Sequence, residues 1–416
     1  MKDKVFKILF MISILPGQLD AQIVQWRGPE RNGIYPDRGL LQEWPEDGPR
    51  LVLEKDGLGT GWSTPVIDNN VILITGRKDA MESLTALKMD GTVLWETIYG
   101  KSWESSFPDT RNSPTIEGDF VYVAGAMGRV NCINKHTGKI VWEVNAHDIY
   151  QGQFHRWGYA ESMVLTDKAV ICSPTGKETV LVALSKKDGS MIWKTEAIGG
   201  VRAYASPMLI NHNGRRLILA QTSVHIIGVD PDNGQIIWKY DLKTDHTVEG
   251  RRNNTNTPIY HKGEIFVTSG YDAQAVMLKL SDDGSSVSLK WTSDVLDTHH
   301  GGVVLVNGYL YGSNWLNNGM GNWVCLDWET GKVKYETEWY NKGSIIYADN
   351  RLYVFEEKQG HLGLVEPDPG KFRVISSFKV KKGTGPFWAH PSIYNGYLLV
   401  RHGDVLMVFD ITKNRS

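Results

Sequence analysis

The chain is poor in cysteine, with only Cys132, Cys172 and Cys325 among its 416 residues. No two of them have the close spacing that zinc sites and redox motifs require. Each lies in an apolar run typical of a strand, in VNCIN, VICSP and WVCLD. We therefore predict three small buried thiols and no structural metal.

Charge of one sign is equally scarce, because 45 lysines and arginines nearly balance 47 aspartates and glutamates, a formal net charge of -2. Such a chain lacks the electrostatic footprint that binds nucleic acid or an acidic membrane surface, so we expect neither as a partner. With 41% apolar residues, 43 glycines and 15 tryptophans, the composition favours a large core built from many short strands.

No long apolar segment stands near the N-terminus: the run from Val5 to Leu15 is far shorter than the ~20 residues needed to span a bilayer. Lys2, Lys4 and Lys7 precede or begin this segment. A basic start followed by a short apolar run is typical of a secretory signal peptide.

Ala21 fits the position before the cleavage site of such a peptide, which predicts Gln22 as the mature N-terminus. We interpret residues 1–21 as the signal peptide, residues 22–49 as an N-terminal extension and residues 50–416 as one domain. No cysteine follows the apolar run closely. We therefore expect no lipid anchor and an exported protein that is periplasmic or secreted.

From residue 50 onward the chain repeats a pattern in which Gly precedes Trp by four positions, as in LKMDGTVLW, INKHTGKIVW, LSKKDGSMIW and VDPDNGQIIW. The aromatic residues that close the pattern are 43 to 53 residues apart and comprise Trp95, Trp142, Trp193, Trp238, Trp291, Tyr335 and Phe378. A period of this length, made of short Val-, Ile- and Leu-rich runs between glycine turns, is typical of a propeller blade. We expect these aromatic residues to pack against the neighbouring blade.

The inner strand of each blade opens with a related segment, and eight such segments occur: WSTPVI, NSPTI, AESMVL, ASPMLI, NTPIY, GGVVLV, SIIYAD and HPSIYN. The eighth unit stops after VLMVFDI, its third strand. RLVLEKD, residues 50–56, directly precedes the first inner strand and is predicted to supply the missing outer strand. The predicted fold is thus all-β, an eight-bladed β-propeller of four-stranded blades whose ring is closed by an N-terminal strand.

The blade pattern resembles the pyrroloquinoline quinone (PQQ) repeat of quinoprotein alcohol dehydrogenases and of the lipoprotein scaffold of the outer-membrane barrel-assembly machine. A more specific resemblance is to exported PQQ-like propellers of environmental bacteria. The segments that carry it are WRGPERNGIYPD, HRWGYAESMVL, HHGGVVLVNGYLYGSN and KGSIIYADNRLYVFEE. The resemblance covers nearly the whole mature chain and implies the fold more strongly than any chemistry.

In quinoprotein dehydrogenases a disulfide between adjacent cysteines covers the cofactor, and a glutamate and an asparagine bind calcium beside a basic aspartate. By this resemblance Glu161 and Asn254 or Asn256 would take the calcium-ligand positions, and Asp297 that of the base. The chain has no adjacent cysteines, and the neighbouring segments are rich in arginine and histidine. We therefore expect no metal and no tightly bound cofactor, with PQQ and calcium as the alternative.

The connections from each outer strand to the next inner strand are predicted to open on one face, around the axis. They hold arginines, histidines and aromatic residues where glycine, serine, asparagine and aspartate are usual. Trp62 and Asn253 also lie in these connections. The candidate ligand-binding residues are Arg111, Asn112, His155, Arg156, Trp157, Tyr159, Arg202, Tyr204, Arg252, Asn254, Asn256, Lys342, Trp388 and His390. The candidate catalytic residues are His299, His300 and Glu161.

Three functions are compatible with this pattern. The first is an exported propeller that binds a small polar or anionic ligand of the acidic-sugar or alcohol type in an axial pocket. This function includes the option that the propeller also processes the ligand chemically. Arginine suits an anion, aromatic rings suit a sugar or quinone, and histidine suits proton transfer. The second is a PQQ-dependent alcohol or sugar dehydrogenase. The third is a non-enzymatic envelope scaffold, which would favour an anchor cysteine and a plain axis.

The signal peptide gives the first testable expectation, because export would remove residues 1–21. Intact-mass measurement of protein recovered outside the cytoplasm should give a chain that begins at Gln22. A chain in that fraction that still carried Met1 to Ala21 would contradict the interpretation.

Overall fold

The structure, a computed structural model, describes residues 23–242 and 253–413. The predicted signal peptide, Gln22 and Arg252 lie outside these residues. Within the described ranges, no helix has the length and apolar character needed to cross a membrane. The only α-helix there is α1 (Ala146–Ile149).

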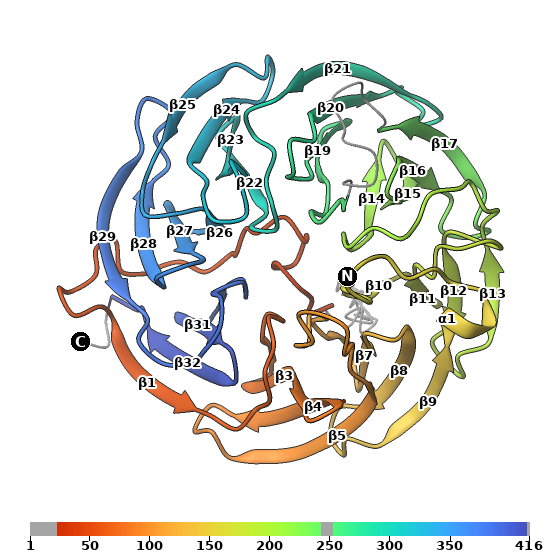
Figure 1. Ribbon diagram of the computed structural model, residues 1–416, viewed down its shortest axis with the longest axis horizontal. Coiled ribbons are helices and arrows are strands. Elements are labelled where there is room, and N and C mark those ends of the chain that lie inside the picture. Colours follow the sequence, from red (N-terminus) through yellow and green to blue (C-terminus); the bar gives the residue numbers. More distant parts are fainter. Residues whose placement is uncertain (1–22, 243–252, 414–416) are drawn as a thin grey trace, which may run out of the picture.

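Strands β1 to β32 form eight antiparallel sheets of four strands each, arranged as blades around a ring (Figure 1). We number the blades 1 to 8 by the order of their inner strands. The inner strands are β2 (Val66–Asp68), β6 (Thr115–Glu117), β10 (Val164–Leu165), β14 (Met208–His212), β18 (Ile259–His261), β22 (Val303–Val306), β26 (Gly343–Ala348) and β30 (Ser392–Tyr394). Seven begin within the predicted opening segments and β26 begins one residue before its segment, so the all-β, eight-bladed prediction is confirmed.

The other three strands of each blade follow in order from the axis outward. The second strands are β3 (Val71–Lys78), β7 (Phe120–Ala124), β11 (Ala169–Cys172), β15 (Arg215–Gln221), β19 (Glu264–Val267), β23 (Tyr309–Ser313), β27 (Arg351–Glu356) and β31 (Tyr397–His402). The third strands are β4 (Met81–Lys88), β8 (Arg129–Asn134), β12 (Val182–Ser185), β16 (His225–Val229), β20 (Ala275–Leu280), β24 (Trp323–Asp327), β28 (His361–Glu366) and β32 (Val405–Asp410). The outer strands are β5 (Val93–Lys101), β9 (Ile140–Asn145), β13 (Met191–Lys194), β17 (Ile236–Asp241), β21 (Val287–Ser293), β25 (Val333–Thr337), β29 (Arg373–Lys379) and β1 (Arg50–Lys55).

Strand β1 closes the ring as predicted, because it pairs antiparallel with β32 and completes blade 8. The pairing runs from Arg50 opposite Asp410 to Lys55 opposite Leu406. Nη2 of Arg50 also lies 2.8 Å from Oδ2 of Asp410. The pairing covers the outer edge of β32, which would otherwise be an exposed strand edge open to aggregation.

Neighbouring blades are joined through the repeated aromatic residue and the repeated glycine. A Cβ atom on Gly189 of blade 3 would lie only 2.8 Å from the ring of Trp142 in blade 2, so the ring packs directly on the glycine backbone. The indole Nε1 of Trp142 donates to the carbonyl of Lys186, also in blade 3, at 2.9 Å. Equivalent ring–glycine contacts join Trp95 to Gly138, Trp193 to Gly234 and Trp291 to Gly331. The predicted packing role of these tryptophans is confirmed.

The closing strand carries the same pair of features as an ordinary repeat. Gly48, which precedes β1 and has a φ of +86°, receives the ring of Phe378 from blade 7. Leu53 within β1 packs in turn on Gly91 of blade 1. The junction between blades 7 and 8 therefore uses the same ring–glycine contact as the four junctions described above.

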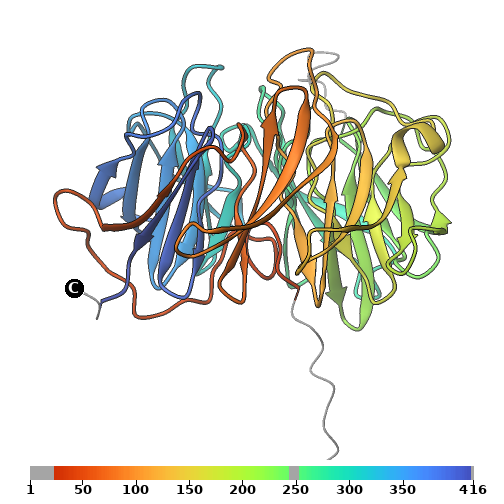
Figure 2. The same cartoon turned by 90° about the horizontal axis from the view of Figure 1, so that it is seen from below.

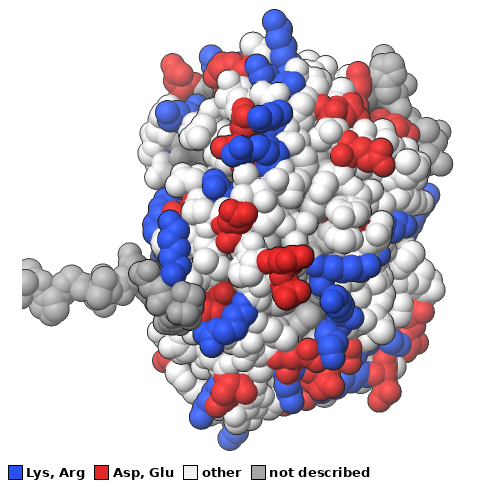
Figure 3. Space-filling view, turned by 90° about the vertical axis from the view of Figure 1, so that its left-hand side faces the viewer, with Lys and Arg blue, Asp and Glu red and all other residues white. Residues whose placement is uncertain are grey.

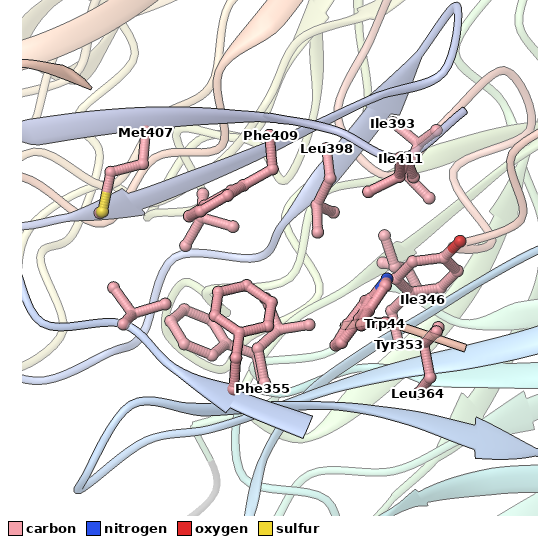
Figure 4. Close-up of a cluster of buried hydrophobic side chains, with 14 of the residues drawn as sticks. Trp44, Ile346, Tyr353, Phe355, Leu364, Ile393, Leu398, Met407, Phe409 and Ile411 are labelled. Carbon is pink, nitrogen blue, oxygen red and sulfur yellow. The ribbon is translucent and has the colours of Figure 1, made fainter. Parts of the chain in front are cut away.

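A large apolar cluster fills the junction between blades 7 and 8 (Figure 4). Phe355 and Leu364 contribute from blade 7, and Leu398 and Phe409 contribute from blade 8. Trp44 of the N-terminal extension, 4% exposed, packs into the same cluster. The extension is therefore part of the propeller core.

The N-terminal extension also crosses the axis of the ring (Figure 1). Val24 forms an isolated bridge with Ile116 of blade 2, and Ile34 forms one with Tyr347 of blade 7. In Figure 2 this red segment lies along the lower edge of the ring, whereas the connection that follows β5 rises at the upper edge. The extension therefore crosses the channel at the end opposite to these connections.

Trp142→Ala tests the packing between blades. Removal of the buried indole should lower the free energy of unfolding by about 3 to 5 kcal/mol, since it leaves a cavity against Gly189. Val141→Ala, at a position on the same strand that is 48% exposed, is the matched control and should change stability by well under half as much. Urea denaturation measures both, and equal losses in the two variants would contradict the packing role.

Candidate functional site

Side chains from non-adjacent blades meet at one end of the axis. The ring centroid of Trp388, before blade 8, lies 5.1 Å from that of His300, before blade 6. The same indole lies 5.5 Å from Phe107, which precedes blade 2. Such contacts across an intervening blade are possible only near the axis, so the predicted convergence is present in the structure.

We call the group that meets here the axial cluster. Its members come from the connections between blades and from the turns between second and third strands: Trp62, Phe107, Arg111, His155, Trp157, Tyr204, Tyr271, His299, His300, Lys342, Glu357 and Trp388.

One part of the axial cluster is an aromatic patch with an arginine beside it. The indoles of Trp62 and Trp388 meet edge to face at 4.8 Å between centroids. The guanidinium carbon of Arg111 lies 5.3 Å from the centroid of the Trp62 ring, and Nη2 donates to the carbonyl of Phe107. Nη1 of Arg111 is buried and has no hydrogen-bond partner among the described residues. This part of the cluster therefore offers a flat apolar surface and a charged donor.

Burial and a nearby acid shape the electrostatics of Arg111. Burial lowers the pKa of Arg111 to about 10, so the guanidinium stays charged at neutral pH. Glu82 at the start of β4 interacts with it electrostatically and accepts from the backbone N–H of Ala126 at 2.7 Å. Burial raises the pKa of Glu82 to about 8. A neutral Glu82 leaves the positive charge of Arg111 available to an anion.

A second part of the axial cluster contains histidine, lysine and glutamate. The rings of His299 and His300 lie 4.1 Å apart, and Nε2 of His299 is 2.7 Å from the hydroxyl of Tyr271. Nζ of Lys342 pairs with Oε1 of Glu357 at 2.9 Å. Burial lowers the pKa of both histidines, so both rings are neutral at pH 7.

A third part lies on blades 3 and 4. The hydroxyl of Tyr204 accepts the backbone N–H of Trp157 at 2.9 Å and lies 3.0 Å from Nδ1 of His155. The rings of Trp157 and Tyr204 are 5.5 Å apart. Arg156, which lies between His155 and Trp157 in the sequence, is exposed. Tyr204 interacts electrostatically with Arg111, which ties this part to the aromatic patch.

Glu161, Arg202 and Tyr159 form a buried structural lock outside this arrangement. Oε2 of Glu161 pairs with Nη2 of Arg202 at 2.6 Å, and Oε1 accepts the backbone N–H of Ser173 at 2.9 Å. The Arg202 guanidinium lies 3.5 Å from the centroid of the Tyr159 ring and is fully buried. Because the polar atoms of this pair are satisfied within the blades, the geometry does not favour a catalytic role for Glu161 or a ligand-binding role for Arg202.

The side chains of the three candidate asparagines form hydrogen bonds with backbone groups. Nδ2 of Asn112 donates to the carbonyl of Ala124, and Nδ2 of Asn254 donates to that of Thr222. Asn256 donates to the carbonyls of Thr298 and His299 and accepts the N–H of Gly302, so it fixes the backbone that carries the histidine pair. These residues support the axial cluster and do not present free polar groups on it, apart from buried carbonyl oxygens of Asn112 and Asn254.

Asp297 and His390 are also engaged by neighbouring backbone. Asp297 accepts the N–H of Trp315 at 3.0 Å and that of Asp272 at 3.1 Å, and burial raises its pKa to about 7. His390 lies 2.8 Å from the carbonyl of His300 and 2.8 Å from Nη1 of Arg27.

These contacts decide whether the residues fit PQQ with calcium. Calcium requires six to eight oxygen ligands. Glu161 is committed to Arg202, and the side chains of Asn256 and Asp297 are committed to backbone groups. The three cysteines are free and buried in separate blades, so none forms the disulfide cover. The residues present do not fit that cofactor shell.

Two arginines of the extension, which sequence reasoning did not single out, approach the axis from the other end. Arg27 donates to the carbonyl of Val303 at 2.7 Å and to that of Ile345 at 3.2 Å. Arg31 donates to the carbonyl of Ser162 at 2.9 Å and to that of Met163. Each is almost fully buried. The sequence signal available for this contact was the presence of two arginines in the segment WRGPERNG of the N-terminal extension.

Sequence reasoning also did not single out Phe107. It missed Glu82, Tyr271 and Glu357 because it considered only the connections between blades. The turns between second and third strands open on the same face, since antiparallel strands alternate in direction. An acid inside the apolar strand MESLTALK and the acid pair that ends RLYVFEE were the signals available for Glu82 and Glu357.

A cleft of about 500 Å³ lies elsewhere, between blades 5 and 6, and is lined by Lys262, Glu264, Lys290 and Trp328 among others. Lys290 pairs there with Glu264 and Glu329. The charges of Lys290, Glu264 and Glu329 are thus satisfied by each other, and the cleft is open to solvent. We place the candidate site at the axial cluster, where buried polar atoms lack partners within the described chain.

Fold and site define the class of protein: an eight-bladed propeller of glycine-tryptophan repeats with a polar and aromatic axial cluster. Residues 80–337 match the family model described as "Outer membrane protein assembly factor BamB", of the PQQ repeat type. The chain belongs to this family. The outer membrane protein assembly factor BamB of Yersinia pestis is 22% identical over 319 residues, 74% of this chain and 75% of that protein.

Solved structures share the architecture. The BamB structure from Moraxella catarrhalis has a TM-score of 0.63 at 14% identity and covers 88% of this chain and 99% of that one. A europium-containing methanol dehydrogenase has a TM-score of 0.68 at 12% identity and covers 91% of this chain and 90% of that one. At such identities the likeness shows a common fold alone.

The raised pKa of Glu82 predicts a pH dependence of stability. A folded pKa of about 8, above the ordinary 4.5, means that the neutral carboxyl stabilises the fold below pH 4.5 and that this contribution is lost as pH rises toward 8. Glu82→Gln keeps a neutral polar group, so the fall in unfolding free energy over this range should become shallower. Urea denaturation across the range measures it.

Glu104→Gln, at an exposed position, is the control for this measurement and should leave the pH profile of the wild type unchanged. If Glu82→Gln and the wild type gave parallel profiles, Glu82 would not be the titrating group.

Proposed function

We propose that this chain is an exported propeller that binds a small polar or anionic ligand, of the acidic-sugar or alcohol type, at the axial cluster. The observation that carries the proposal is the patch formed by Trp62, Trp388 and Arg111. It joins two partly exposed indoles to a guanidinium that has one unpartnered nitrogen.

The chemistry of this patch favours a ring that carries a carboxylate or a similar anion. A guanidinium recognises carboxylate, sulfate or phosphate through two parallel N–H groups. An indole face packs well against an apolar ring face while polar groups at the ring edge stay solvated. Trp62, Phe107 and Trp388 supply such faces beside Arg111.

The N-terminal extension supports approach from one end only. Arg27 and Arg31 bind inner-strand carbonyls on opposite sides of the axis, in blades 6 and 7 and in blade 3. A ligand would therefore reach Trp388 and Arg111 from the face that carries the connections between blades. Binding is the function proposed, and no reaction is assigned to the patch.

A second candidate is a non-enzymatic scaffold for envelope proteins. The name of the Yersinia pestis relative, an outer membrane protein assembly factor, favours it. The outer strands of blades 1 to 3 also expose large apolar side chains, including Leu94, Val141, Met191 and Ile192. Contiguous exposed apolar surface is typical of protein interfaces. On another side of the molecule acidic and basic side chains are interspersed (Figure 3).

Ligand binding is tested by thermal-shift and calorimetric titration with uronic acids, sugar phosphates and small alcohols, together with mass spectrometry of ligands retained on purification. Arg111→Gln should weaken binding of an anionic ligand about 10- to 100-fold, because it removes a charge-assisted contact. Trp388→Leu should also weaken it, whereas the melting temperature of the unliganded protein should change little in either variant.

Arg216→Gln is the matched control, since Arg216 pairs with Asp167 and Asp232 on the outer surface. It should bind like the wild type. Equal affinity of Arg111→Gln and the wild type would contradict the proposal. Absence of any small ligand together with stoichiometric recovery of an envelope assembly protein would favour the scaffold in its place.

A further inference from the structure

Three potential metal ligands come together in the axial cluster. His299 and His300 precede β22 of blade 6, and Glu357 follows β27 of blade 7. One donor atom from each residue lies within 4.8 Å of the donors of the other two. The donors are supplied by two neighbouring blades, so the packing of blade 7 against blade 6 creates this group.

The free lone pairs of the histidines point to a missing partner. His299 is 9% exposed, and its Nε2 is engaged by the hydroxyl of Tyr271, whereas its Nδ1 is buried without a hydrogen-bond partner among the described residues. Nε2 of His300 is likewise unpartnered by any hydrogen bond in the described chain. Buried polar atoms without partners are rare in folded proteins, and a ring nitrogen held by a polar neighbour while the other is free is typical of a metal ligand.

Glu357 supplies the charge that a metal ion needs. Its Oε1 pairs with Lys342, which also donates to the carbonyl of Asn317 at 3.0 Å. Its Oε2 lies 3.6 Å from Nε2 of His300, beyond hydrogen-bond length. Lys342 is therefore directed to one oxygen, and the other oxygen faces the histidine.

The donor set selects the class of ion. Two imidazole nitrogens and one carboxylate oxygen suit zinc and similar divalent transition metals, which leave a fourth position to water. Calcium is disfavoured because it requires six to eight oxygens. The donors need to move closer by side-chain rotation, since ligand atoms on one tetrahedral zinc ion lie about 3.3 Å apart.

We propose that His299, His300 and Glu357 form a site for a divalent transition metal ion of the zinc class, positioned by Tyr271 and with its open coordination position beside Trp388. The expectation from sequence was that the chain holds no metal. The proposal is independent of the small ligand proposed above, because the ion is bound by different side chains and is measured alone.

The test is titration of mature protein, first treated with chelator and dialysed, with zinc by calorimetry and with cobalt by visible absorption. We expect one ion per chain and the absorption bands of cobalt in a tetrahedral site. His300→Ala and Glu357→Gln should each weaken zinc binding at least 100-fold. Tyr271→Phe should weaken it about 10- to 100-fold, since it removes the group that positions His299.

His155→Ala is the matched control, because His155 lies in the axial cluster but bonds to Tyr204 and is not one of the three donors. It should retain full zinc affinity. Circular dichroism and melting curves of the metal-free variants check that each is folded. Glu357→Gln preserves the shape of the side chain, so it remains informative if His300→Ala fails to fold.

Two results would overturn the proposal: absence of stoichiometric zinc binding by the wild type, or retention of wild-type affinity in folded Glu357→Gln. Loss of zinc binding in Arg111→Gln would not be expected, and loss of the organic ligand in that variant with zinc binding intact would separate the two sites. Failure of organic-ligand binding with zinc binding intact would reject only the ligand-binding function.

Discussion

The packing of an aromatic ring from one outer strand onto a glycine turn of the next blade is the contact on which the ring depends. Trp95, Trp142, Trp193 and Trp291 make it with Gly138, Gly189, Gly234 and Gly331. A Cβ atom at any of these glycines would lie 2.5 to 2.8 Å from the ring, so a larger residue would push the blades apart. The indole N–H also donates to a carbonyl of the following blade. At these four junctions apolar burial and a hydrogen bond thus fix the position of one blade against the next.

Because each blade contacts mainly its two neighbours, the stability of the ring depends on the junctions where the two ends of the chain meet. Phe378 on Gly48 and Leu53 on Gly91 extend the same contact across the two chain ends. Trp44 adds a further buried ring to the junction of blades 7 and 8. Nearest-neighbour coupling of this kind is typical of repeat proteins, where terminal units need special protection. In this ring, β1 near the N-terminus pairs with β32 near the C-terminus, so each covers an edge that the other would leave exposed.

Closure then determines what lies at the axis. Arg27 and Arg31 bind carbonyls in or next to the inner strands of blades 3, 6 and 7, so hydrogen bonds compensate the two buried guanidinium groups for lost solvation. Glu161 and Arg202 neutralise each other inside the blades, and Lys342 pairs with Glu357. Among the groups that remain without a hydrogen-bond partner in the described chain are Nη1 of Arg111, Nδ1 of His299 and Nε2 of His300. The chemistry proposed for the site rests on these unpartnered nitrogen atoms. It does not rest on the fold, because assembly factors and dehydrogenases share that fold.

The sequence by itself determined the number of blades, the inner-strand positions and the closing role of residues 50–56, because the repeat of glycine and tryptophan encodes each junction locally. It also placed Trp62, Arg111, His300 and Trp388 at one end of the axis, since the direction of each strand follows from the order of strands in a blade. Only the tertiary structure decided the partners of these side chains. Glu161 and Arg202 lie 41 residues apart, and no local pattern marks them as a pair. Glu357 meets His300 only because blade 7 packs against blade 6, so their contact is a consequence of packing between blades that no single repeat encodes.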